Sequence, residues 1–294
     1  MQCFKFIKMK KIFFLASIFV FINCQNSNTS KLVTKFELPK KLKEISGLIM
    51  AENQKSIWCI EDSGNENEIS LIDSLGNITK SIVIENAENI DWEDITKDKD
   101  GNLYIGDFGN NDNDRQDLSI HKINKNDLSK SNVATIQKTT FSYNEQKDFP
   151  AKKNNKLFDV ESFFEFDNYF YLITKNRNKK FDGRALVYKI ANANGTQTAD
   201  LIGKINTGTS FENGAITSAA ISDDQTKVVL LTHSKIILFE DFGMKPFFEG
   251  TRSDIELNHI SQKESICFKN NNTVLIADEQ DKKTGGVVYE IKLF

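Results

Sequence analysis

Acidic side chains recur at matching points of the sequence. One set opens short apolar runs, as in DWEDIT, DVESFF and KESICF, and another closes the runs that follow, as in SIWCIED, LYIGDFG and TVLIADE. If these runs are strands of similar sheets, both sets meet at one end of the fold. Carboxylate oxygens from several loops suit Ca²⁺, which takes about six to eight oxygen ligands with loose geometry. The predicted metal or ligand site comprises Glu93, Glu161, Glu264, Asp62, Asp107 and Asp278.

Carboxylates that lie this close together repel one another unless a cation, a hydrogen-bond network or raised pKa values relieve them. A purely structural role is therefore the alternative to a cation site, because such acids can cap backbone N–H groups or pair with Lys175 or Arg177. Zinc is disfavoured, since the three histidines share no ligand spacing. The sequence has no glycine-rich phosphate loop, serine nucleophile elbow or Cys-His pair, so no catalytic residue is predicted.

The elements that must position these acids are strands. From Leu32 onward, short runs of β-branched and aromatic residues alternate with Asn, Asp and Gly turns. Five units repeat one order of three strands, and they begin near residues 45, 92, 160, 216 and 263. A fourth, outer strand follows each of the first four units, at 78–85, 133–143, 198–205 and 247–257. Self-similarity of this kind is typical of propellers.

The fifth unit lacks an outer strand, whereas residues 32–38 (LVTKFEL) form a strand without a unit. Placing this strand on the fifth sheet closes the ring and covers an exposed edge. The prediction is an all-β fold, a single β-propeller of five four-stranded blades closed by the N-terminal strand. A sixth blade within 125–158, a β-sandwich and a two-domain all-β protein are the alternatives.

Residues 1–24 precede the propeller domain, which is predicted over 32–294. Four lysines stand before the apolar run 12–22 (IFFLASIFVFI), a pattern typical of a secretory signal and too short for a membrane span. The run ends at Cys24 in a sequence that resembles a lipobox, so we expect Cys24 to be acylated and 25–31 to form a polar tether. A plain signal peptide is the alternative. The expected location is the cell envelope, lipid-anchored at the outer membrane or the periplasmic face.

The net charge bears on the kind of binding partner, and the two cysteines of the propeller bear on its disulfide content. The net charge of -3 and a pI near 5.8 give no electrostatic reason to expect nucleic acid. Cys59 and Cys267 sit in apolar strand patterns, so we expect buried thiols, with a disulfide between them as the alternative outside the cytoplasm.

The repeated motifs also resemble known families. EISGL, DWEDIT, DVESFF and KESICF are similar to the ISGL, WEDI, DxEA and GEAI signatures of propellers of the SdiA-regulated and esterase-like phytase families, and more distantly to NHL-repeat and gluconolactonase propellers. The resemblance spans nearly all of 36–294. It implies a channel mouth where acids hold Ca²⁺, with Glu93, Glu161 and Glu264 at the matching positions. Lys263 replaces the glycine of the last motif, and the fourth unit offers Ser218 in place of an acid.

Three functions follow from these observations. The first is an envelope-anchored propeller binding protein with an acidic, Ca²⁺-binding channel mouth for a small ligand or another envelope protein. The second, implied by the resemblance, is a calcium-dependent hydrolase of phosphoesters or lactones in which Glu93, Glu161 or Glu264 activates water beside the metal. The third is a protein-interaction scaffold. The fold by itself does not decide among them.

Overall fold

The computed structural model describes residues 31–282 and 284–293. The predicted signal peptide 1–24, its acylated Cys24 and all of the tether except Lys31 lie outside the described residues. Within the described ranges, no helix combines the length and apolar character needed to cross a membrane.

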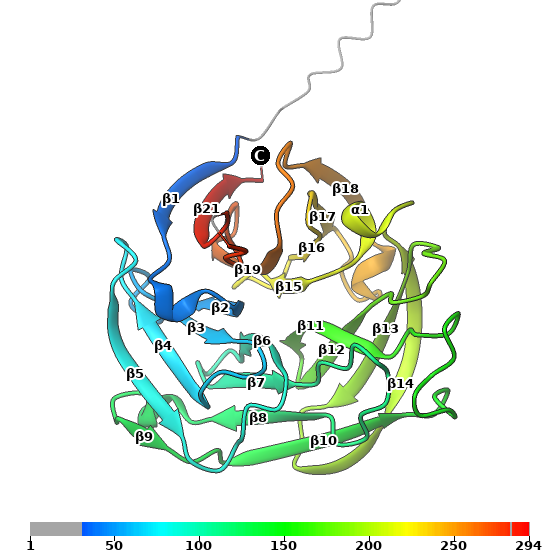
Figure 1. Ribbon diagram of the computed structural model, residues 1–294, viewed down its shortest axis with the longest axis horizontal. Coiled ribbons are helices and arrows are strands. Elements are labelled where there is room, and N and C mark those ends of the chain that lie inside the picture. The colour runs from blue at the N-terminus through cyan, green and yellow to red at the C-terminus, as the bar shows by residue number, and fades with distance from the viewer. Residues whose placement is uncertain (1–30, 283, 294) are drawn as a thin grey trace, which may run out of the picture.

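Five antiparallel four-stranded blades stand radially around a central axis, and an edge pairing joins blades two and three into one eight-stranded sheet. Figure 1 shows the radial arrangement. The innermost strands are β2, β6, β11, β15 and β19, and each packs beside its neighbours until the ring closes. The prediction of five four-stranded blades is confirmed, and the sandwich and two-domain alternatives are wrong. Each blade is given from its innermost strand outward. Blade one comprises β2 (Ile45–Met50), β3 (Ile57–Glu61), β4 (Glu68–Ile72) and β5 (Ile78–Ile84), and blade two comprises β6 (Trp92–Lys97), β7 (Leu103–Asp107), β8 (Ser119–Ile123) and β10 (Gln137–Tyr143). Blade three comprises β11 (Asp159–Phe166), β12 (Tyr169–Lys175), β13 (Arg184–Ala191) and β14 (Gly195–Asn206); blade four comprises β15 (Ser218–Ile221), β16 (Lys227–Leu231), β17 (Lys235–Glu240) and β18 (Thr251–Glu256); and blade five comprises β19 (Lys263–Asn270), β20 (Thr273–Asp278), β21 (Val287–Lys292) and β1 (Val33–Glu37).

The ring closes through the two ends of the domain. Strand β1 pairs antiparallel with β21, with Val33 opposite Glu290 and Glu37 opposite Val287. In Figure 1 the blue β1 accordingly lies beside the red β21. The predicted closure by residues 32–38 is confirmed, and the last blade is built from both ends of the propeller domain.

Residues 125–158 do not form a sixth blade. After the short helix η2 (Lys125–Asp127), β9 (Asn132–Val133) adds to β5 as a parallel edge strand of blade one. Strand β10 is the outer strand of blade two and pairs in parallel with β14 of blade three. The predicted outer strand 133–143 is therefore wrong at its start, because Val133 belongs to the neighbouring blade. Alternation along one strand does not reveal which partner its edge will take.

Apolar side chains fill the spaces between adjacent blades. Phe108 of blade two meets Phe163 of blade three edge to face, with ring centroids 5.1 Å apart, and Phe163 in turn contacts Phe170. Such aromatic pairs stabilise the packing beyond the area that they bury. Cys59 and Cys267 are buried free thiols, so the disulfide alternative is wrong.

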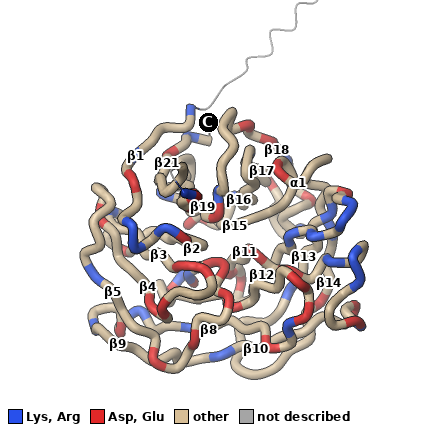
Figure 2. The backbone as a smooth tube through the Cα atoms, in the orientation of Figure 1, with Lys and Arg blue, Asp and Glu red and all other residues tan. Residues whose placement is uncertain are grey.

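Three further short helices lie in the connections. They are η1 (Lys40–Leu42) before β2, α1 (Phe211–Gly214) before β15, and η3 (Phe247–Glu249) before β18. Since η1 and α1 precede inner strands, they lie at the end of the channel where those strands begin. Figure 2 shows segments rich in Asp and Glu near the centre of the ring.

Candidate functional site

Bulges at the starts of four inner strands build one mouth of the channel. The pairing register skips one residue in each of these strands, and the skipped residues are Ser46, Glu93, Glu161 and Glu264. A β-bulge leaves the extra residue unpaired and re-aims its side chain. All four line a single polar cavity of about 190 Å³. The repeated bulge therefore brings Ser46 and the three glutamates together in one cavity.

Blade four carries a threonine at this position, and the alignment of Ser218 with the acids is wrong by one residue. Ser218, the first residue of β15, and the preceding Thr217 both meet Leu231, so two residues face one as in a β-bulge. The Ser218 hydroxyl instead donates to Oδ2 of Asp94 at 3.3 Å and accepts from the Ile266 N–H at 3.1 Å. Thr217 is thus the counterpart of the bulged acids, and Ser218 belongs to a deeper ring that ties blades together.

The second strands contribute side chains according to their alternation. Asp62, Lys175 and Glu279 line the cavity. Asp107 and Asp278 pair with the first residues of β6 and β19 and lie one position earlier in the register than Asp62 and Glu279. The one-residue difference reverses the direction of the side chain, so these two acids do not line the cavity.

Both of these acids have internal partners instead. Asp107 Oδ1 accepts from Arg115 at 2.9 Å and from the Asp91 N–H at 3.1 Å. Asp278 accepts from the Val287 N–H at 2.8 Å and from the Tyr289 hydroxyl at 3.0 Å. Of the six predicted site residues, the structure brings together Glu93, Glu161, Glu264 and Asp62, and it places Asp107 and Asp278 in supporting hydrogen bonds.

One side of the cavity is neutralised by basic residues. Lys175 Nζ lies 2.9 Å from Glu161 Oε2 and 3.8 Å from Glu264 Oε2. Arg177 binds Asp159 and the second oxygen of Glu161. Burial opposes the ionisation of Glu161, but the charges of Lys175 and Arg177 prevail and lower its pKa to about 2. Glu161 is therefore a permanently ionised member of a buried ion-pair network.

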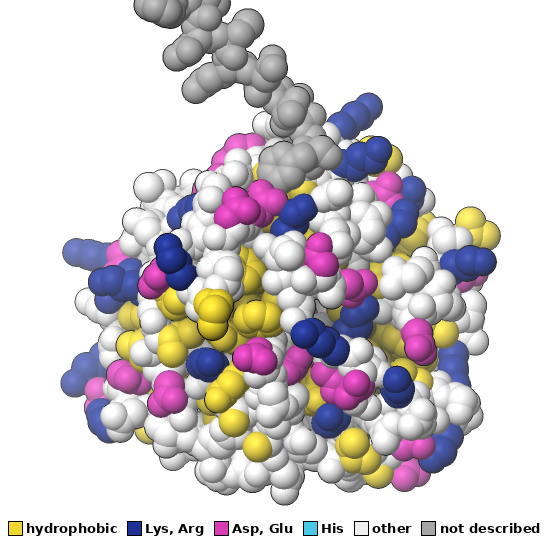
Figure 3. Space-filling view, turned by 180° about the vertical axis from the view of Figure 1, so that it is seen from behind, with side chains coloured by type: hydrophobic (Ala, Val, Ile, Leu, Met, Phe, Trp, Pro, Cys, Tyr) yellow, Lys and Arg dark blue, Asp and Glu magenta, His cyan; other side chains and the backbone are white. Residues whose placement is uncertain are grey.

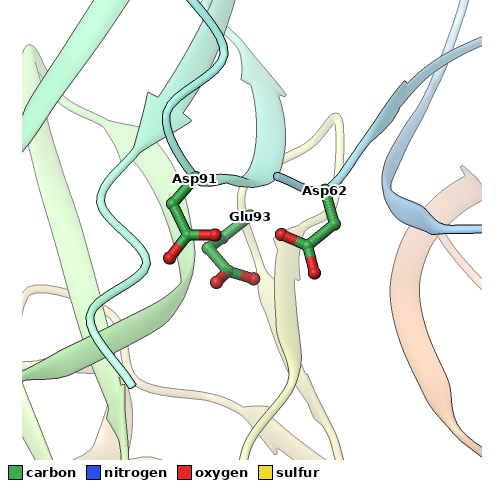
Figure 4. Close-up of side chains that lie close together, drawn as sticks. All are labelled: Asp62, Asp91 and Glu93. Atoms are coloured by element: carbon green, nitrogen blue, oxygen red, sulfur yellow. The ribbon is translucent and has the colours of Figure 1, made fainter. Parts of the chain in front are cut away.

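Asp62 and Glu93 line another part of the cavity, and the carboxylate of Asp91 lies beside them. Asp62, Asp91 and Glu93 each place one oxygen within 4.8 Å of the other two (Figure 4). Among the described residues, none of these three acids forms an ion pair with a lysine or arginine. Glu93 is 7% exposed, and no described residue donates a hydrogen bond to its carboxylate. We refer to Asp62, Asp91 and Glu93 as the acidic triad.

The electrostatics of the acidic triad follow from that isolation. Burial, reinforced by the charges of Glu161, Asp62 and Asp91, raises the pKa of Glu93 well above its usual value. Burial and the nearby Asp91 raise the pKa of Asp62 to about 7. Without a cation, Glu93 and Asp62 hold protons at a pH where exposed carboxyls have lost them.

Two residues that the sequence analysis did not select, Asn111 and Gln262, also line the cavity. Asn111 and Gln262 lie on connecting loops, and Gln262 Nε2 donates to Glu279 Oε2 at 3.0 Å. Burial and the charges of Glu264 and Asp62 raise the pKa of Glu279 to about 8. The Oγ atom of Ser46 is buried and has no hydrogen-bond partner among the described residues. No repeat marks Asn111 or Gln262, so the strand pattern could not have identified them.

Gly109, in the loop between β7 and β8, lies directly against two carboxylates of the acidic triad. A Cβ at this position would lie 2.2 Å from Glu93 Oε1 and 2.3 Å from Asp91 Oδ2. The backbone is held there because Gly109 N–H donates to the Asp91 carbonyl and its carbonyl accepts from Arg115. Only glycine lets the loop approach the two carboxylates this closely.

The opposite end of the channel has a different character. Figure 3, seen from behind, shows hydrophobic side chains near the middle of that face with charged side chains around them. A groove of about 320 Å³ between blades one and two has a mixed lining that includes Met50, Trp58, Leu103, Lys97 and Glu52. Asp98, Asp100 and Asp223 line the same groove, but Lys99 and Lys125 line it as well, so its carboxylates stand among lysines.

Comparison with known proteins supports the fold. No known protein family and no curated protein matches the sequence. The PQQ-bound aldose sugar dehydrogenase from Streptomyces coelicolor superposes with a TM-score of 0.50 at 10% identity, over 90% of this chain and 98% of that chain. The nidogen/laminin complex gives a TM-score of 0.48 at 12% identity, over 85% of each chain. The likeness to the dehydrogenase supports a β-propeller and carries no ligand or activity with it.

Proposed function

We propose that the protein is a β-propeller binding protein whose acidic mouth holds a divalent cation, Ca²⁺, at Asp62, Asp91 and Glu93. The observation that carries the proposal is Glu93, a carboxylate that is buried beside two others and receives no hydrogen bond from a described residue. A buried charge is costly unless it is paired or binds a metal. A cation at the triad would supply the missing partner for all three acids.

The choice of Ca²⁺ rests on the ligand chemistry. The triad offers hard carboxylate oxygens, and Glu279 and Asn111 offer further oxygens in the same cavity. Within the described residues no sulfur atom lines the cavity, and the imidazole of His233 lies outside the lining, with its Nε2 3.3 Å from Glu264 Oε1. Oxygen-only sites with several carboxylates favour Ca²⁺ over Zn²⁺.

Thermal unfolding after EDTA treatment, with Ca²⁺, Mg²⁺ or Zn²⁺ added back, tests this function. A ligand at about 100 times its Kd stabilises the folded state by about 2.7 kcal/mol, so Ca²⁺ should raise the melting temperature. Asp62→Asn and Glu93→Gln should abolish the rise. Glu52→Gln is the matched control, because it removes one charge from an exposed position at the opposite mouth. A wild-type protein that melts at the same temperature with and without Ca²⁺ would refute the proposal.

A hydrolase is the second candidate, and among the bulged acids its base is assigned to Glu93, which belongs to the acidic triad. Glu161 is a poor base because its two ion pairs hold its pKa at about 2. Glu93, whose pKa is raised, could accept a proton from water beside the cation. A screen with p-nitrophenyl phosphate and simple lactones would detect turnover that requires Ca²⁺ and is lost in Glu93→Gln. Turnover that survives in Glu93→Gln would exclude this assignment.

We also propose that the propeller is exported and anchored through an acylated Cys24. The support is the lysine-rich, then apolar, leader that ends at this cysteine. Expression of the full chain in a bacterial host, followed by membrane fractionation and intact-mass measurement, tests the anchor. Cys24→Ser should move the protein to the soluble fraction without the mass of the acyl chains. A full-length protein of unmodified mass would contradict the anchor.

A further inference from the structure

We infer that the mouth cavity takes a small polyhydroxylated ligand, a single sugar ring or a comparable polyol, held through its hydroxyl groups. The inference deepens the proposed function, because it places the ligand beside the cation at the acidic triad. It is carried by the mixture of hydrogen-bond donors and acceptors around one small polar cavity.

Donors and acceptors face the same space. The acceptors are carboxylates of Asp62, Glu93, Glu264 and Glu279, and the side chains with N–H donors are Lys175, Arg177, Asn111 and Gln262. With a cation at the acidic triad, an anionic ligand would still meet the carboxylates of Glu264 and Glu279, and an amine would meet two basic side chains. A hydroxyl group both donates and accepts, so it satisfies either kind of neighbour.

Several of these groups have hydrogen-bonding capacity to spare. Ser46 Oγ is buried in the cavity wall at 3% exposure and has no partner among the described residues. Arg177 uses Nε and Nη2 on Asp159 and Glu161, and no described residue accepts from its Nη1. Buried polar atoms are seldom left unpaired in folded proteins. Ser46 therefore indicates a polar partner that enters the cavity from outside.

The size of the cavity limits the ligand. Its volume of about 190 Å³ is below the range of roughly 300 to 1,000 Å³ typical of drug-sized ligands. One ring with its hydroxyl groups is therefore the largest unit that we expect to enter fully. A longer saccharide would have to extend out of the mouth.

An aromatic pair stands beside the basic side of the cavity. Phe211 of α1 packs against the Arg177 guanidinium at 6.0 Å and against Phe181 at 6.1 Å, and both rings are half-buried. Neither ring lines the cavity, so together they offer an apolar surface outside it, next to Arg177. A sugar ring presents C–H groups on its face, so this surface suits the part of a longer saccharide that extends out of the mouth.

Saturation-transfer NMR of the full domain with neutral pentoses and hexoses tests this inference, in Ca²⁺ and separately in EDTA. Putrescine and inorganic phosphate serve as the amine and anion probes. We expect saturation of at least one neutral sugar in Ca²⁺, and an affinity at least tenfold lower in Ser46→Ala. Because Ser46 Oγ has no described partner, Ser46→Ala should keep the wild-type melting temperature and Ca²⁺ response. Ser63→Ala, on the exposed neighbour of Asp62, is the control.

The outcomes separate this inference from the proposed function. A Ca²⁺ response without binding of any neutral sugar, or binding of putrescine or phosphate alone, would overturn the ligand class and leave the cation site standing. Sugar binding that is equal in EDTA, with no Ca²⁺ response, would support the ligand class and overturn the cation. A Ser46→Ala variant that binds sugar as wild type does would contradict the assignment of Ser46.

Discussion

Glu93 and Glu161 occupy the same bulged position in neighbouring blades, yet they differ in their tendency to ionise. Lys175 and Arg177 lower the pKa of Glu161 to about 2, whereas burial and neighbouring acids raise the pKa of Glu93 well above its usual value. The backbone device is shared, so the difference comes from the end of β12, where blade three supplies the two basic residues. One acid is thereby fixed as part of the structure, and the other is available to a ligand.

The ion pair between Lys175 and Glu161 gives the first prediction. Lys175→Met should destabilise the protein by about 3 kcal/mol, because removing one partner of a buried pair leaves an uncompensated charge. Lys175→Met combined with Glu161→Gln should recover much of that loss, since no isolated charge is then buried. Urea denaturation of the two single variants and the double variant measures the coupling. Additive effects would contradict the assigned network.

The pH dependence of stability gives the second prediction. The pKa of Glu279 is about 8 and that of Asp62 about 7 in the folded state, against about 4 in an unfolded chain. The folded state therefore binds more protons than the unfolded state between about pH 4 and 8, and stability of the cation-free protein should fall as pH rises through this window.

Thermal melts in EDTA from pH 5 to about 8.5 would show this fall, and Glu279→Gln should flatten the slope. Ca²⁺ should stabilise the protein most at the alkaline end, where it competes with fewer protons. A melting temperature that rises with pH in EDTA would contradict the assigned pKa directions.

Gly109 gives the third prediction. The methyl group of Gly109→Ala would overlap Glu93 and Asp91, so the two carboxylates must separate. We expect the Ca²⁺ affinity to fall by tenfold or more, while circular dichroism still reports an all-β protein. Equal Ca²⁺ affinity in Gly109→Ala and wild type would show that the triad does not hold the cation in the arrangement described.

Ring closure gives the fourth prediction. A protein that begins at residue 39 lacks β1 and exposes the edge of β21. It should melt at a lower temperature than a protein that begins at residue 31, and it should form larger species in size-exclusion chromatography because an open strand edge invites pairing. Equal melting temperatures would mean that β1 contributes little to closure.

The repeat order predicted the fold well, because each blade must bury its own alternating strands against its neighbours. The same order placed Glu93, Glu161, Glu264 and Asp62 at one mouth. It failed for Asp107 and Asp278, because alternation reverses a side chain when the register shifts by one residue. In blade four the alignment failed for a related reason, since Thr217 and not Ser218 stands at the position of the bulged acids.

Other parts of the site lay beyond the reach of the strand pattern. Asn111 and Gln262 reach the cavity from connecting loops, where no periodicity constrains the side chains. Gly109 is set by a close approach between a loop and two carboxylates, which depends on the assembled ring. The parallel pairing of β10 with β14 likewise depends on how two blades meet.

Calorimetric titration of the metal-free protein with Ca²⁺, beside the Glu93→Gln variant, tests the cation site most directly. We predict one saturable Ca²⁺ site in the wild-type protein and no saturable binding in Glu93→Gln, with wild-type behaviour in Glu52→Gln. A wild-type protein that binds no Ca²⁺, or a Glu93→Gln variant that binds it as tightly as wild type, would contradict the account of the acidic mouth.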